Sequence, residues 1–162
     1  LPICFVGAVA DYKDLEMLKI CEDRLLLIAP NKGKYAQIKK DSLTWEDIAA
    51  ERFIVREEGS ATKDLFFKGL HKLGIDTKKL NIAAVIEDSD TIKECVREGL
   101  GLAVVSELMI RKDIELKRLK GFFLPELELE RRFYFINHKK RVLNPLDQTF
   151  KEFATGYFSP KT

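Results

Sequence analysis

Two short stretches of this chain lead from an apolar strand directly into a helix, and this junction constrains the fold most strongly. The first is FIVREEGSATKD at residues 53–64, whose helix begins at Ser60. The second is VIEDSDTIK at residues 85–93, with Asp88 and Ser89 at the helix start. Backbone N–H groups at a helix N-terminus have no partner inside the helix and attract anions. Two such junctions predict an α/β domain with a ligand site.

The rest of the chain alternates strand and helix patterns without an internal repeat. Around the two junctions, a βαβαβ unit is predicted from strands at 53–55, 82–86 and 100–105 and helices at 60–73 and 89–98. The strand at 100–105 is apolar on both faces, as in a central parallel strand covered by helices. Further elements are predicted as strands at 3–8, 15–20, 24–29 and 132–136, an extended piece at 122–124, and helices beginning near 44, 107 and 144. A turn at residues 21–23 separates two of these strands.

Several helix ends carry explicit signals. Thr44 is expected to cap a helix with Asp47 in the capping-box position, and Asn144 to cap the last one. Gly74 and Gly99 follow helices and supply the left-handed stop that many helix ends need. The helix at 60–73 is expected to bury Phe66, Phe67, Leu70 and Leu73. The last helix carries one apolar stripe, formed by Leu146, Phe150, Phe153, Ala154 and Tyr157.

Composition excludes several classes of function. Of the 162 residues, 46% are hydrophobic, which suffices for one good core or two small ones. The formal net charge is only +2, so this segment is not expected to bind a nucleic-acid backbone itself. No apolar run approaches the ~20 residues that span a bilayer, and the first residues lack a signal-peptide pattern. We therefore expect no membrane association and a cytoplasmic location.

Neither catalysis nor metal or cofactor binding is expected. Cys4, Cys21 and Cys95 show no C-x-x-C spacing and are interpreted as small core residues. His71 and His138 are isolated and are interpreted as surface residues. The sequence has no recognisable nucleophile–base pair, paired catalytic carboxylates or glycine-rich phosphate loop, so we predict that the chain is not an enzyme.

Several segments together resemble a known family. FIVREEGSATKDLFFKGLHKLGI, EDSDTIKECVREGLGLAVVSE and RRFYFINHKKRVLNPLDQTFKEF look like the effector-binding domain of LysR-type transcriptional regulators. That family commonly reads R-E-x-G-S-x-T-[RK], followed by E-S-x-x-I-K-x-x-V-x-x-G-L-G-[IV]-A. DRLLLIAP and SLTWEDIAA agree as well, so the resemblance extends over nearly the whole chain.

The resemblance implies an α/β fold similar to type 2 periplasmic binding proteins. Two Rossmann-like subdomains would be joined by two crossover strands, with a small-molecule cleft between them. Residues 23–120 would form the second subdomain. Residues 1–22 and 121–162 would supply the crossover and part of an incomplete first subdomain. The family pattern also implies that this chain is N-terminally truncated, without about two leading β-α units and without the DNA-binding winged helix-turn-helix.

The implied function is sensing. A small metabolite bound in the cleft would change the relative orientation of the subdomains and thereby control transcription. The implied partners are that effector, further copies in a homodimer or homotetramer, DNA through the absent N-terminal domain, and RNA polymerase. The alternative is a lobe of a periplasmic-type solute-binding protein, which shares the fold but normally carries an export signal.

The resemblance assigns the effector site to two helix starts and the first strand. The residues are Arg56, Glu58, Gly59, Ser60 and Thr62 at the first helix start, Asp88 and Ser89 at the second, and Val6 and Gly7 at the end of the first strand. The loop at 59–62 has no cysteine, so a thiol switch for oxidants is not expected.

Simpler roles for these residues stay open from their chemistry alone. Ser60 and Ser89 could serve only as helix caps, each worth about 1 kcal/mol, and Thr62 could bond only to its own backbone. Arg56 could form a surface ion pair with Glu57 or Glu58. If Glu58 and Asp88 faced the cleft, they would oppose an anionic effector and favour one that carries an amine.

Overall fold

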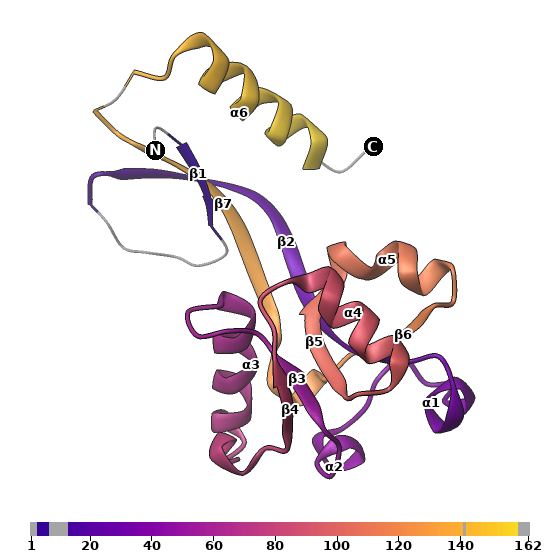
Figure 1. Cartoon of the computed structure of the whole chain (residues 1–162). Coiled ribbons are helices and arrows are strands. Elements are labelled where there is room, and N and C mark those ends of the chain that lie inside the picture. Colours follow the sequence, from indigo (N-terminus) through magenta and orange to yellow (C-terminus); the bar gives the residue numbers. More distant parts are fainter. Residues whose placement is uncertain (1–2, 7–12, 141, 159–162) are drawn as a thin grey trace. The chain divides into compact units, whose positions relative to one another are not determined.

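The chain folds into two compact units, seen here in a computed structural model that describes residues 3–6, 13–140 and 142–158 (Figure 1). Unit 1 comprises Leu1–Asp23 and Glu130–Thr162, and unit 2 comprises Arg24–Leu129. Strand β2, Leu15–Pro30, contributes its first part to unit 1 and its second part to unit 2. The second passage between the units lies at Leu129, just before β7.

Unit 2 is a mixed sheet covered by helices. Strand β3 (Phe53–Val55) lies parallel to β4 (Ile82–Val85) on one side and to β5 (Leu102–Ser106) on the other. Strand β2 runs antiparallel to both β5 and β6 (Leu119–Phe122). The helices are α1 (Gly33–Gln37), α2 (Trp45–Ile48), α3 (Ala61–Lys72), α4 (Ser89–Glu98) and α5 (Glu107–Glu115), with short 3₁₀ turns η1 (Thr77–Lys79) and η2 (Pro125–Leu127). The predicted βαβαβ unit is confirmed.

The core of unit 2 divides between the two faces of the sheet because successive strand residues point to opposite sides. In β2, Leu25 and Leu27 belong to one buried cluster, while Leu26 and Ile28 belong to the other. Helix α3 contributes Phe66 and Leu70 to the first cluster. Helices α4 and α5 contribute to the second cluster with Ile92, Val96 and Ile110. All five residues of β5 are buried, as expected for a strand covered on both faces.

The sequence signals at helix ends are confirmed in four places. The Thr44 side chain accepts from the Asp47 amide while the Asp47 carboxylate accepts from the Thr44 amide, which completes the capping box. Gly74 and Gly99 adopt φ angles of +75° and +89°, the left-handed region that favours glycine. In unit 1, Asn144 Oδ1 accepts from the Asp147 amide at 2.8 Å at the start of the last helix.

Besides the first part of β2, the described part of unit 1 contains an antiparallel pair of strands and one helix. Strand β1 (Ile3–Val6) pairs with β7 (Glu130–His138), and helix α6 (Pro145–Phe158) follows. Of the predicted stripe on α6, Ala154 is 4% exposed and Leu146 is 77% exposed. The aromatic members of the stripe are also exposed, namely Phe150, Phe153 and Tyr157.

The predicted turn at residues 21–23 is wrong, because β2 runs unbroken for 16 residues. Glu22 and Asp23, two acidic residues in the middle of a strand pattern, favour a turn, but Asp23 has a partner that the local sequence does not reveal. Its carboxylate accepts from Arg131 Nε of β7 at 2.8 Å, and its side chain is fully buried. This ion pair lies at the point where the chain passes from unit 1 to unit 2.

Other predictions need smaller corrections. Leu73 is 42% exposed because α3 ends one residue earlier, at Lys72. Cys4, Cys21 and Cys95 are half-buried, and Cys95 packs against the second core cluster. The extended piece expected at 122–124 is strand β6, which lies slightly earlier and pairs with β2.

The second boundary between the two units lies between residues 129 and 130, nine residues after the expected boundary between residues 120 and 121. The intervening segment contains η2, which lies against α3. A Cβ atom on Gly69 of α3 would stand 2.7 Å from the Leu127 carbonyl oxygen, so glycine permits this close approach. The packing of η2 therefore places residues 121–129 with unit 2.

Candidate functional site

The start of α3 combines an unusual backbone with a buried hydroxyl residue. Gly59 has φ of +82°, and Ser60 occupies the N-cap position with only 7% exposure. The Ser60 carbonyl accepts the first helical hydrogen bond from the Asp64 amide at 2.9 Å, but its side chain makes no capping hydrogen bond. The interpretation of Ser60 as a side-chain cap is therefore wrong.

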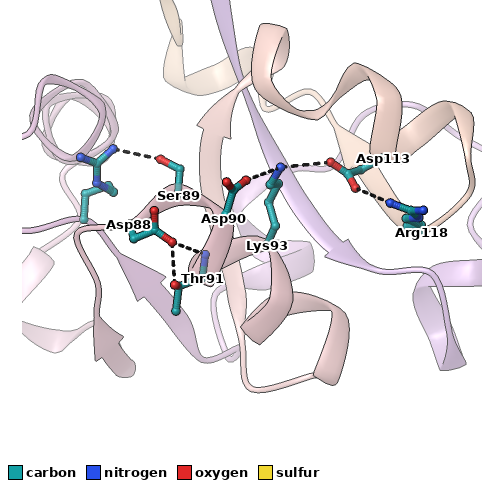
Figure 2. A network of polar contacts seen from close by, with 8 residues as sticks. Asp88, Ser89, Asp90, Thr91, Lys93, Asp113 and Arg118 are labelled. Atoms are coloured by element: carbon teal, nitrogen blue, oxygen red, sulfur yellow. Dashed lines mark hydrogen bonds and ion pairs between the residues drawn. The ribbon is translucent and has the colours of Figure 1, made fainter.

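The start of α4 is capped by Asp88 and not by Ser89 (Figure 2). The Asp88 carboxylate accepts from the Thr91 amide at 2.7 Å and from the Thr91 hydroxyl at 2.6 Å. These hydrogen bonds, the hydroxyl bond first, lower the pKa of Asp88 below its ordinary value. Ser89 is the first helical residue, so its predicted capping role is also wrong.

The replacement Asp88→Ala should lower the melting temperature by a few degrees, because two donors at the start of α4 lose their acceptor. Ser89→Ala should leave it nearly unchanged, since Asp88 provides the cap. Thermal unfolding followed by circular dichroism measures both. Equal losses in the two variants would contradict the assignment of the cap.

The stability that the Asp88 cap contributes should depend on pH. Because the folded-state pKa of Asp88 is lowered, its stabilising contribution is complete above the unfolded-state value of ~4 and is lost as pH falls through the lowered value. Asp88→Asn keeps an acceptor but cannot titrate. The stability difference between wild type and this variant should therefore shrink in acid, and a constant difference would count against the linkage.

Arg56 links the two helix starts. Its guanidinium forms a two-point ion pair with Glu57, with Nε and Nη2 at 2.8 and 2.9 Å from the carboxylate oxygens, and its Nη1 donates to Ser89 Oγ at 3.4 Å. The Glu57 carboxylate, through these hydrogen bonds, raises the pKa of Arg56. The predicted ion pair of Arg56 is confirmed with Glu57. The hydrogen bond from Nη1 to Ser89 is long, so Nη1 is the guanidinium nitrogen that the protein binds most weakly.

A small recess of about 10 Å³, enough for one water-sized group, lies beside this arginine. Arg56, Thr62 and Lys63 are its polar lining residues, and the apolar ones are Ile54, Val55, Phe66 and Val104. Of the nine residues assigned from sequence, the lining includes only Arg56 and Thr62. Gly59, Ser60, Glu58, Asp88 and Ser89 do not line it.

Lys63 is the lining residue that sequence reasoning missed. Its side chain is only 9% exposed, pairs with Glu58 and lies with Nζ 5.3 Å from the centre of the Phe67 ring. The last position of the motif R-E-x-G-S-x-T-[RK] falls on Lys63, so a signal was present in the sequence. The two cations of the recess are both paired within the protein, Arg56 with Glu57 and Lys63 with Glu58.

A cluster of charged side chains links α4 to α5 (Figure 2). Lys93 Nζ lies 2.8 Å from Asp90 and 3.3 Å from Asp113, and Arg118 lies 3.9 Å from Asp113. Lys93 and Asp113 are each less than 20% exposed. The helix that presents Asp88 and Ser89 is therefore held on its other side by a charged link to α5.

The remaining assigned residues lie on the first strand or just beyond it. Val6 is on β1, opposite Tyr134 of β7. Gly7 lies outside the described residues. Within the described part of the chain, no group of His, Cys, Asp and Glu could hold a metal ion. No described helix combines the length and apolar character needed to cross a bilayer.

The side chains of Arg56 and Lys63 thus lie together at the start of α3, beside a mixed α/β sheet. Comparison with known families is specific. The chain belongs to the family described as LysR substrate binding domain, whose model matches residues 3–159. The resemblance seen in the sequence is confirmed. Members of this family are parts of transcription regulators and not enzymes, in agreement with the prediction.

Individual proteins agree with this assignment. The chain is 32% identical over 143 residues to an uncharacterized HTH-type transcriptional regulator of Methanocaldococcus jannaschii, covering 88% of this chain and 48% of that protein. The chain thus spans about half the length of the curated relatives it matches.

Solved structures share the fold. The CcmR regulatory domain of Synechocystis PCC6803, solved in complex with 2-PG, superposes with a TM-score of 0.83 at 21% identity, covering 98% of this chain and 74% of that one. The effector binding domain of QuiR in complex with shikimate gives 0.77 at 19% identity, covering 97% and 71%. The fold is therefore that of LysR regulatory domains.

Proposed function

We propose that this chain is the effector-sensing part of a LysR-type transcriptional regulator and that its effector binds at the starts of α3 and α4. The observation that carries this placement is the recess lined by Arg56, Thr62 and Lys63. The recess accepts only one small group, so it would hold the end of an effector and not the whole molecule. The solute-binding alternative has the same fold, and the family match favours the regulator.

The charges of the recess favour an anionic group on the effector. Arg56 and Lys63 supply two cations, and the first amides of α3 add the positive end of the helix dipole. The carboxylate of Asp88 is occupied by Thr91, and that of Glu58 is 91% exposed and paired with Lys63. Because Arg56 is paired with Glu57 and Lys63 with Glu58, an anionic effector group would bind by displacing these carboxylates. The bound shikimate of QuiR is a carboxylate.

Other parts of the proposal rest on the family alone. The two-subdomain arrangement with its cleft, the homodimer or homotetramer, the contacts with DNA through a separate domain and with RNA polymerase, and the cytoplasmic location all stay predictions. The contributions of Val6 and Gly7 to the site also stay predictions.

A thermal-shift screen tests the function. We expect at least one carboxylate or phosphate ester, from a panel that includes 2-PG and shikimate, to stabilise the chain by RT ln(1 + [L]/Kd), which is about 2.7 kcal/mol at a hundredfold excess over Kd. Arg56→Met and Thr62→Val should each reduce that shift, because each removes a polar lining group.

Arg111→Met is the matched control. Arg111 is 61% exposed on α5, so its loss removes the same charge away from the recess. A ligand that stabilises all four proteins equally would bind elsewhere and would refute the placement of the site. A complete absence of stabilisation by the panel would count against an anionic effector.

A further inference from the structure

The Arg56 guanidinium lines the recess with one of its hydrogen-bonding edges already occupied. This edge, formed by Nε and Nη2, faces the two carboxylate oxygens of Glu57 at 2.8 and 2.9 Å. Paired N–H···O bonds of this kind are the arrangement in which arginine recognises carboxylates and phosphates most specifically. Glu57 therefore occupies donors that an anionic effector group would use.

The Glu57 side chain can leave Arg56 without a change in the fold. Glu57 follows Arg56 directly in the chain, and its carbonyl accepts from the Ser60 amide at 3.3 Å, which holds the backbone. Its side chain is 35% exposed and does not line the recess. The carboxylate can thus rotate into water while the walls of the recess stay in place.

Glu57 faces both cations of the recess. The hydrogen bonds from Arg56, and more weakly the charge of Lys63, lower the pKa of Glu57. Because Glu57 is tethered beside Arg56, a free ligand must compete with a carboxylate that is held at high local concentration. A monocarboxylate that enters would only replace one carboxylate by another. It would gain little from the exchange.

A phosphate group differs from a carboxylate in charge and in the number of its oxygens. It carries a charge of about −1.5 to −2 at pH 7 and has three acceptor oxygens. Two of these oxygens can take the Arg56 edge that Glu57 leaves, and the third remains for the recess, where the Lys63 ammonium supplies further N–H donors. The recess holds one water-sized group, so it fits one such oxygen. A carboxylate with both oxygens on Arg56 leaves none for the recess.

We propose that Glu57 is a specificity-determining residue of the effector site, whose carboxylate competes for Arg56 and so admits a phosphate group but excludes a monocarboxylate. The inference rests on the proposed effector site and adds to it a residue that does not line the recess. Removal of the competing charge should tighten the binding of phosphate and also admit carboxylates.

Inorganic phosphate and acetate are the probes, added to the intact chain in a thermal-shift titration against sodium chloride at the same pH and ionic strength. The wild type should be stabilised by phosphate and not by acetate. Glu57→Gln keeps the size of the side chain but removes its charge. This variant should bind phosphate roughly three- to tenfold more tightly and should also be stabilised by acetate. The double variant R56M/E57Q should lose both effects.

Glu128→Gln is the matched control. Glu128 is 70% exposed and pairs with Lys72, the last residue of α3, so this change removes a paired carboxylate at the opposite end of that helix. Glu128→Gln should bind both probes as the wild type does. Circular dichroism checks that each variant is folded.

The outcomes separate the role of Glu57 from the placement of the site. If Arg56→Met abolishes phosphate binding but Glu57→Gln binds phosphate no more tightly than the wild type and still rejects acetate, the site stands and the role of Glu57 is overturned. If phosphate stabilises the wild type and Arg56→Met equally, the placement of the site fails and the inference fails with it. A folded Glu57→Gln variant that neither anion stabilises would overturn the inference as well.

Discussion

Asp23→Ala should destabilise the chain by about 3–5 kcal/mol, as expected when one partner of a buried ion pair is removed. The Asp23 side chain is fully buried and that of Arg131 is 12% exposed. Without the carboxylate, the guanidinium would stay in a region that water barely reaches, although part of its charge is also met by the ring of Phe133 at 4.8 Å. Urea denaturation at constant m-value measures the loss.

The neighbouring residue on the same strand provides the control. Glu22 pairs with Lys19 at 2.6 Å and with Arg132 at 3.6 Å, and its side chain is 65% exposed. Glu22→Ala should leave the denaturation midpoint nearly unchanged, because water screens both of these pairs. If the two alanine variants were equally stable, Asp23 would not hold a buried charge, and its position within β2 would need another explanation.

Phe66→Ala should cost about 3–5 kcal/mol, within the range for removing a large buried aromatic side chain. Phe66 is 2% exposed, and its ring centre lies 5.9 Å from those of both Phe53 and Phe67. It also lines the candidate recess, so the truncation should enlarge that recess. Urea denaturation gives the stability change, and the thermal-shift panel shows whether effector binding changes with it.

Phe67→Ala, one residue further along α3, is the comparison. Phe67 is only partly buried at the margin of the same cluster. Its loss should therefore cost clearly less. A Phe67 variant as unstable as the Phe66 variant would mean that the core of unit 2 extends over the face of α3 that carries Lys63.

Local chemistry explains what the sequence predicted well. The capping box of Thr44 and Asp47 and the left-handed Gly99 depend on residues within one turn of each other, so their signals are complete in a short stretch. The alternation in β2 and β5 likewise identifies both faces of the sheet. The family resemblance rests on many such local matches in order.

Contacts between distant segments explain what the sequence did not predict. Asp23 lies within a strand, where its buried carboxylate accepts a hydrogen bond from Arg131, 108 residues away. Ser60 has the residue type and position of a cap, yet it is buried without a capping bond, and at α4 the neighbouring Asp88 takes that role. Lys63 was not assigned to the site from the sequence, but it lines the recess and its Nζ lies 5.3 Å from the centre of the Phe67 ring.

The arrangement of the chain at Leu25 and Leu129 has a consequence for the order of folding. Unit 2 is one continuous segment, whereas unit 1 needs residues separated by more than a hundred positions. The Leu25 amide donates to the Leu129 carbonyl at 2.8 Å, so unit 2 holds its own two ends together. Residues 24–129 form the loop that separates the two segments of unit 1, and the folding of unit 2 already brings the ends of this loop together. The entropy cost of closing the loop is therefore met before unit 1 forms, and we expect unit 1 to fold after unit 2.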